Sequence, residues 1–458
     1  MKPQLTTVRT LDLLRTYESR NVTFIEPDGS WPIVWERANG VHVWDAEGEK
    51  YLDLTAAFGV AAAGHTNPRV VRAGQRQMAK LLHAMGDVHP HALKAELARE
   101  LSGITFERWT KRNPKSEIRN PKSGKVVFCN SGFEAVEAAL KTALLATSKP
   151  GVIAFEGAYH GLGYGVLNTT HREHFRGPFR SQLKEFGQFV PFPVAADVSR
   201  LTSSMSRRNE PTHVGCHKVE KQIRSLLRSG QIGAVLVEPI QARGGINIPP
   251  PDFLPMLRKL CDERGALLVL DEIYTGFGRA GKWFACEHSG VVPDIICLGK
   301  ALTGGFPLSA CVGRADAMDA AWPPSSGEAI HTSTFLGHPV GCAMALAQIS
   351  EIRRLKLCER SAKLGQNLLS QLQAVHASRF TLHARGMGLM AGLELRKSDG
   401  SPATQETLRI IKAMLHRGFI LLPEGEHGNV ISFTPPLTVT VAQLTRTVRA
   451  LKEVLRSE

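Results

Sequence analysis

An acid and a lysine each follow a short apolar run in the segment from Ala266 to Ser309. Asp271 comes after Leu267–Leu270, and Lys300 comes after Ile295–Leu298 and one glycine. Such runs are typical of core strands in a parallel sheet, and ligands bind at the carboxyl ends of those strands. A carboxylate and an amine delivered there suit pyridoxal phosphate: the lysine can form a Schiff base with the aldehyde, and the acid can keep the pyridine nitrogen protonated. Alone, the two residues fit a helix cap and a surface lysine equally well.

A turn at residues 130–135 offers a phosphate site. It contains Ser131, Gly132 and Phe133, follows the apolar run Val126–Phe128, and opens a segment with apolar residues at one-face helical spacing. The free N–H groups at the positive end of a helix dipole bind phosphate well. The alternative is an ordinary helix cap by Ser131.

Two further apolar runs end in residues that could contact a flat cofactor. Val152–Phe155 leads to Tyr159 and His160, where an aromatic ring could stack on the cofactor. Ala234–Val237 leads to Glu238-Pro239-Ile240-Gln241, and the amide of Gln241 could hydrogen-bond a phenolic oxygen.

In this order, these pieces resemble the class III aminotransferases, pyridoxal-phosphate enzymes of fold type I. The resemblance covers nearly the whole chain. It rests on Trp44-Asp45, Gly48, Tyr51-Leu52-Asp53, Gly64-His65 and Pro68 near the start, on Leu270-Asp271-Glu272 with Gly276, Gly278-Arg279 and Gly281, and on Gly299 to Pro307.

The resemblance implies roles for individual residues. Lys300 would be the Schiff-base lysine, Asp271 the partner of the pyridine nitrogen, Tyr159 the stacking ring and Gln241 the contact to the ring oxygen. Gly132 and Phe133 would bind the phosphate through their amides, and Thr334 would reach the phosphate of the neighbouring subunit. The expected cofactor contacts also include Ser131, His160 and Glu238. The site is therefore expected at the interface of a homodimer.

Composition agrees with a soluble enzyme. The chain has 458 residues, 43% of them hydrophobic, and no apolar run approaches the roughly 18 residues of a membrane span. Met1 to Phe24 has no apolar core and does not read as a secretory signal. The eight cysteines form no CxxC pair, and several lie in apolar runs, so we expect buried free thiols and a cytoplasmic location.

No metal site is expected. His213, Cys216 and His217 are close in sequence, but they lack a second ligand pair at zinc spacing. They sit at the end of the polar stretch Ser203 to Gly215, which reads as a surface loop.

Part of the net charge of +14 comes from one short segment of the chain. Lys111 to Lys125 carries six basic residues and one acid, and Arg112 to Ser116 recurs as Arg119 to Ser123. We interpret 111–125 as an exposed basic insertion, with binding to nucleic acid or an anionic surface as the alternative. Nucleic acid is not expected as a partner; the remaining positive charge favours an anionic cofactor and substrate.

Three function classes remain open. The favoured one is transamination, in which an amine, ω-amino or amino acid donor passes its amino group to a 2-oxo acid. A pyridoxal-phosphate racemase, epimerase or aminomutase would use the same lysine and acid. The third is a basic binding protein without catalysis. The need for an amino acceptor separates the first two.

Two departures from the family pattern concern the substrate. The family's arginine three residues before the C-terminal Pro-Pro is Ser432 here, and the arginine that often follows Tyr-His-Gly is Leu162. Arg243 is the nearest replacement by sequence, ahead of Arg172 and Arg176. A salt bridge at the surface or between subunits is the alternative for Arg243.

We expect an α/β architecture in which a large domain, residues 76–330, carries the cofactor on a mostly parallel sheet of the seven-stranded type. Residues 1–75 would join residues 331–458 in a smaller α+β domain. Leu393, Leu395 and Ile420-Leu421 mark short strands there, and Gln405–Arg417 and Val441–Leu455 are helical in pattern.

The insertion generates a test. Replacing Asn113 to Lys122 by Gly-Ser should leave fold and activity nearly unchanged, because the segment is polar and has paired prolines, with little to bury. Thermal unfolding, size-exclusion chromatography and turnover are the measurements. Unfolding, or loss of the dimer, would show that the insertion is structural.

Overall fold

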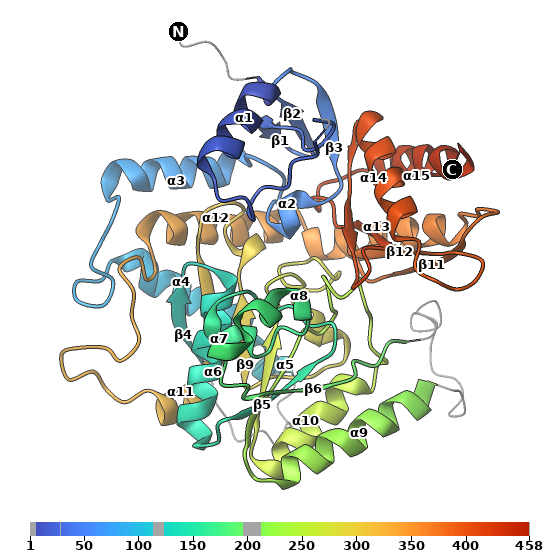
Figure 1. Ribbon diagram of the computed structural model, residues 1–458. Coiled ribbons are helices and arrows are strands. Elements are labelled where there is room, and N and C mark those ends of the chain that lie inside the picture. Colours follow the sequence, from blue (N-terminus) through green and yellow to red (C-terminus); the bar gives the residue numbers. More distant parts are fainter. Residues whose placement is uncertain (1–5, 28, 113–122, 196–211, 458) are drawn as a thin grey trace.

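A seven-stranded sheet forms the centre of the computed structural model, which describes residues 6–27, 29–112, 123–195 and 212–457 (Figure 1). Strand β10 runs antiparallel to both of its neighbours, and β5 to β9 pair in parallel. The predicted α/β class and the five apolar runs predicted as strands are confirmed. In sheet order, the strands are β4 (Gly124–Cys129), β10 (Ser309–Arg314), β9 (Ile295–Leu298), β8 (Leu267–Asp271), β7 (Ile232–Val237), β5 (Gly151–Phe155) and β6 (Gly187–Val190).

Helices cover both faces of this sheet. In β7, Ala234 and Leu236 pack in one apolar cluster with helix α6, while Val235 and Val237 pack in the main core with α4 and α10. Alternate side chains of a strand point to opposite faces, so a strand covered on both sides is apolar throughout. These helices are α4 (Ala92–Ile104), α6 (Gly132–Thr147) and α10 (Phe253–Arg264).

Other helices and turns connect the strands or flank the sheet. They are α5 (Phe106–Arg112), α7 (Tyr164–Leu167), α8 (Glu173–Arg176), η1 (Gly177–Gln182), α9 (Thr212–Arg228), η3 (Ala285–His288), η4 (Lys300–Leu302) and α11 (Ala315–Ala321), together with α3 (Pro68–Lys80) and α12 (Pro339–Arg354), which pack side by side (Figure 1).

Two four-stranded sheets are built from the chain ends. In the first, β3 pairs in parallel with β13, so Leu52 lies opposite Phe419 and the two termini share a sheet. This sheet is β1 (Trp35–Asn39), β2 (His42–Asp45), β3 (Lys50–Asp53) and β13 (Phe419–Ile420); the second is β11 (Thr381–Gly386), β12 (Ala391–Arg396), β15 (Val430–Phe433) and β14 (Leu422–Glu424). The helices of these regions are α1 (Thr7–Tyr17), α2 (Ala56–Gly59), α13 (Leu357–Gln373), α14 (Thr404–His416) and α15 (Val441–Ser457). The domain limits at 75 and 330 stay predictions, and residue 75 falls within α3.

The basic insertion and the polar stretch 203–215 lie partly outside the residues that the structure describes. Most of the basic insertion, 113–122, lies outside them; α5 ends at Arg112 and β4 begins at Gly124. The polar stretch 203–215 was expected to be a loop, but α9 begins at Thr212, so its last residues are helical, and residues 203–211 lie outside the described part. Cys216 and His217 lie on α9, whose apolar residues Val219 and Ile223 recur four apart and pack in the core. All eight cysteines are free and buried, as predicted.

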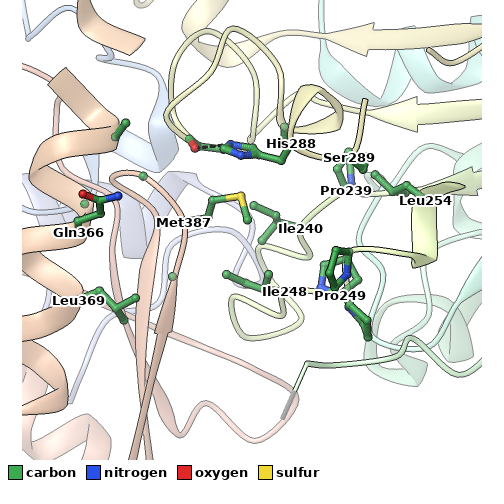
Figure 2. A pocket seen from close by; sticks show the side chains of 18 residues that line it. Pro239, Ile240, Ile248, Pro249, Leu254, His288, Ser289, Gln366, Leu369 and Met387 are labelled. Atoms are coloured by element: carbon green, nitrogen blue, oxygen red, sulfur yellow. Dashed lines mark hydrogen bonds between the residues drawn. The ribbon is translucent and has the colours of Figure 1, made fainter. Parts of the chain in front are cut away.

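An apolar pocket separates the C-terminal elements from the central sheet (Figure 2). Ile240, Ile248 and Pro249 face Leu369 of α13 and Met387 across it. Beside this pocket the backbones come very close: α13 has a glycine at 365, and a side-chain carbon there would overlap the backbone of Gly388, which itself contacts the backbone of Ala280. Gly365 therefore sets the distance between α13 and the loop at 279–281.

This contact predicts a stability difference between two helical glycines. Gly365→Ala should destabilise the protein by about 1–3 kcal/mol, because backbone must move to accommodate the methyl group. Gly103→Ala on α4 is the matched control: nothing lies within 4 Å of the added carbon, so helix propensity should stabilise it by about 0.5–1 kcal/mol. Thermal unfolding measures both. Equal midpoints for the two variants would contradict the close approach at Gly365.

Candidate active site

Residues from the carboxyl ends of β4, β5, β7, β8 and β9 line one cavity of about 500 Å³. Because neighbouring parallel strands end at the same edge of the sheet, side chains far apart in sequence meet there. The structure brings together most of the predicted site: Gly132, Phe133, Tyr159, His160, Glu238, Arg243, Asp271 and Lys300.

Asp271 is held by two hydrogen bonds. Its Oδ2 accepts from His160 Nδ1 (2.8 Å), and its Oδ1 accepts from the backbone N–H of Ile273 (3.1 Å). Both Asp271 and His160 are buried, and His160 Nε2 has no hydrogen-bond partner in the described part of the chain. An ionised carboxylate can only accept, so in that form His160 Nδ1 is the donor of this hydrogen bond. The two hydrogen bonds fix the orientation of the Asp271 side chain in the cavity wall.

Lys300 begins the turn η4 directly after β9. Its φ of +43° is in the left-handed region, where a residue with a side chain is uncommon. Its Nζ lies 4.5 Å from the centroid of the Tyr274 ring. Burial lowers the pKa of the Lys300 amine, while Asp271 and Glu238 act in the opposite direction. The amine can therefore lose its proton more readily than a surface lysine.

The turn before α6 presents the expected anion site. Glu134 Oε2 accepts from the backbone N–H groups of Asn130 (2.6 Å) and Ser131 (2.9 Å), which fixes the turn. Ser131 O accepts from Ser309 Oγ (2.5 Å), and the Ser131 side chain forms a capping box with Glu134 at the start of α6, which is the helix cap named as the alternative. A capping hydroxyl still has its own O–H, and at the N-terminus of a 16-residue helix it is a suitable donor to a phosphate.

Glu238 organises the loops around Tyr159. Its two oxygens accept from the N–H groups of Tyr159 (3.0 Å) and Ala242 (3.1 Å). Burial, with the neighbouring Asp271, raises the pKa of Glu238 to about 7, and His160 opposes this shift. Glu238 thus positions Tyr159 through its backbone.

Gln241 does not reach the cavity. Its Nε2 donates to Glu156 O (2.7 Å), and its Oε1 accepts from Asn247 Nδ2 (3.1 Å), so its amide is used within the loop. The expected contact of Gln241 to a ring oxygen stays a prediction. Tyr274, three residues after Asp271, lines the cavity instead, with its hydroxyl 3.1 Å from Thr434 Oγ1. Its position just past a strand end was the signal that sequence reasoning missed.

Thr334 is exposed and is not among the residues that line the cavity. Its expected contact crosses a subunit boundary and stays a prediction. Phe58 and Glu424 also line the cavity and were not foreseen. Both come from segments distant in sequence, so no local pattern pointed to them.

The arginine candidates separate clearly. Arg243 lines the cavity, with its guanidinium carbon 5.1 Å from the centroid of the Tyr159 ring. Its Nε has no hydrogen-bond partner in the described part of the chain. Arg172 instead donates to the backbone oxygens of Arg243 (2.5 Å) and Gly425 (2.6 Å). Arg176 lies over Phe189 and is not among the lining residues.

The two departures from the family pattern differ in position. Leu162 lines the cavity, while Ser432 is buried and donates to Leu422 O (3.1 Å). Neither brings a positive charge.

Comparison with known proteins agrees with this site. The family model described as aminotransferase class-III matches residues 25–455. Acetylornithine aminotransferase of Methanosarcina mazei is 34% identical over 425 residues, covering 93% of this chain and 92% of the relative. Putrescine aminotransferase of Pectobacterium atrosepticum is 36% identical over 437 residues, covering 93% and 83%.

Solved structures show the same fold. An amine transaminase from an uncultivated Pseudomonas species, determined with pyridoxal phosphate bound, is 28% identical with a TM-score of 0.81, covering 96% of this chain and 98% of that one. An aminotransferase of Bacillus anthracis is 26% identical with a TM-score of 0.84 and 99% coverage of each chain. The fold is thus that of the fold type I transaminases. The chain belongs to the class III aminotransferase family, and its activity is pyridoxal-phosphate-dependent transamination.

The residues present fit this cofactor. His160 Nε2 is a buried polar atom without a partner among the described residues, the Ser131 hydroxyl lies at the N-terminus of α6, and the Asp271 carboxyl is fixed in the wall. When bound, pyridoxal phosphate supplies an aldehyde that captures amino groups and a ring that stores an electron pair. The turn at 131–133 would hold its phosphate, Asp271 its pyridine nitrogen and Tyr159 one face of its ring.

Lys300 gives the sharpest test of the site. Lys300→Ala should lower turnover by about 10²–10⁴-fold or more if the Lys300 amine exchanges protons at the reacting carbon, as the sequence predicts. The cofactor should then no longer be covalently attached, as measured by absorbance after dialysis and by mass spectrometry. Lys259→Ala, whose side chain is 70% exposed on α10, is the control. Full activity of Lys300→Ala would overturn the assignment.

Proposed function

We propose that this transaminase moves the amino group of an ω-amine or a bulkier amino compound to a 2-oxo acid, and that Arg243 binds the carboxylate of the acceptor. The observation that supports this is the guanidinium of Arg243 in the cavity wall, with a free Nε. An arginine fork holds a carboxylate by two parallel hydrogen bonds, which Ser432 and Leu162 cannot supply. Without Arg243, simple α-amino acids and 4-aminobutyrate should therefore be poor donors.

We assign the chemistry to two residues. Lys300, with its lowered pKa, would accept the proton of the substrate carbon at Nζ and donate it again from the same atom. Asp271, oriented by His160, keeps the pyridine nitrogen protonated so that the ring withdraws electrons. His160 acts as a positioning residue for Asp271.

The relatives support a donor with a terminal amine. They include an enzyme named 5-aminovalerate aminotransferase, from Pseudomonas aeruginosa, besides the acetylornithine and putrescine enzymes.

We further propose a homodimer in the cytoplasm. An exposed Thr334 suits a phosphate contact across a subunit interface, and eight buried free thiols suit a reducing compartment. No helix in the described ranges is long and apolar enough to cross a membrane.

The assignment of Arg243 is tested with a panel of amine donors against pyruvate and 2-oxoglutarate. Arg243→Ala should raise the KM for the acceptor about tenfold or more, because a charge-assisted hydrogen bond is worth about 1.5–3 kcal/mol, with little change in cofactor absorbance. Arg456→Ala, an exposed arginine near the end of α15, is the control. Unchanged kinetics for every donor and acceptor would return Arg243 to a structural role.

A further inference from the structure

Three acids line the active-site cavity, and they differ in how their oxygens are used. Asp271 accepts from His160 and Ile273, and both oxygens of Glu238 accept from backbone N–H groups. Glu424, at the end of β14, is only 5% exposed, and its Oε2 has no hydrogen-bond partner among the described residues. Glu424 is thus the acid in this cavity with unused acceptor capacity.

The backbone around Glu424 is fixed. The N–H of Gly425 donates to Arg243 O (3.1 Å), and the Arg172 guanidinium bridges Arg243 O and Gly425 O. Glu394 pairs with Arg385, whose Nε donates to Gly245 O (3.0 Å) on the same loop. These contacts hold the Arg243 loop and the end of β14 together, so the Glu424 side chain cannot leave the cavity wall by a movement of its own strand.

A buried carboxyl without a partner is costly, and the cost falls when a cation supplies hydrogen bonds. Burial raises the pKa of Glu424, and Arg243, Arg172 and Lys300 act in the opposite direction. Arg172 is bonded to backbone oxygens, and Glu424 Oε2 accepts no hydrogen bond from any of these three cations. A ligand that donates a hydrogen bond to this oxygen would therefore lower the cost of burying the carboxyl group.

We infer that Glu424 is a specificity-determining residue that binds a second, non-reacting ammonium group of the donor, so that the preferred donors are α,ω-diamines. The inference rests on the transamination proposed for this cavity. One amino group reacts and leaves with the cofactor, while the other stays charged at Glu424. Donors with a carboxylate at the same end are repelled by Glu424.

The experiment compares three donors of matched length: 1,5-diaminopentane, pentylamine and 5-aminovalerate. The variants are Glu424→Gln, Glu424→Asp and, as control, Glu426→Gln, which is exposed two residues further along. Glu424→Gln should lower kcat/KM for the diamine about tenfold or more, mainly through KM, and leave pentylamine nearly unchanged. It should raise kcat/KM for 5-aminovalerate. Glu424→Asp should recover part of the diamine preference.

Opposite changes for cationic and anionic donors cannot arise from a general loss of structure. Equal losses for all three donors, or a native enzyme without a preference for the diamine, would overturn the inference.

A binding measurement separates this inference from the proposed function. In the Lys300→Ala background with cofactor, calorimetry should show 1,5-diaminopentane binding more tightly than pentylamine, and Glu424→Gln should remove the difference. If the native enzyme turns over none of these amines with any acceptor, the proposed donor class is wrong, and calorimetry still decides the role of Glu424. If it turns over all three and calorimetry shows no difference, only the role of Glu424 is wrong.

Discussion

Parallel hydrogen bonding between β7, β8 and β9 is the constraint on which the active site depends. Val237 pairs with Leu270 and Asp271 pairs with Cys297, so Glu238, Asp271 and Lys300 leave the sheet at one edge, next to each other. The register holds because both faces of these strands are buried, and a shift by one residue would turn every apolar side chain to the wrong face. The stability of the core and the geometry of the site therefore have the same cause.

The two acids at the end of β8 show how the fold handles buried charge. Asp271 turns toward the cavity and His160, whereas Glu272 accepts from the N–H groups of Ala285 and Cys286 (both 2.8 Å) and from the Thr275 hydroxyl. Burial raises the pKa of Glu272 to about 7, and these hydrogen bonds oppose the shift. One acid anchors the loop after β8, and its neighbour stays available for a ligand.

The sequence was sufficient for the strands and for the residues directly after them, because an apolar run and its polar end are local signals. Gln241 shows the limit of this reasoning: four residues past a strand, the direction of a side chain depends on the loop, and Asn247 and Glu156 bind its amide. Glu424 reaches the cavity because β14 pairs with β15 and the N–H of Gly425 donates to Arg243 O.

The pairing of β3 with β13 likewise joins residues more than 300 positions apart. No periodicity in the sequence predicts that pairing. The prediction of a loop up to Gly215 was wrong at its end, because α9 packs its apolar residues against the core and its first turn extends into this polar stretch.

A transaminase binds two different substrates in turn at one cofactor, so its cavity must suit both. Here a cation and an acid, Arg243 and Glu424, stand in the same wall without a hydrogen bond between them. If the two side chains paired, each would cancel the other and the cavity would be neutral to both substrates. Arg172 holds their backbones close while leaving both side chains unpaired. Ser432 donates to Leu422 O and brings no charge to the cavity, whereas Arg243 and, at the end of β14, Glu424 place opposite charges in its wall. Such a wall can bind an acceptor carboxylate in one half of the reaction and a donor ammonium in the other, without any movement of the strands.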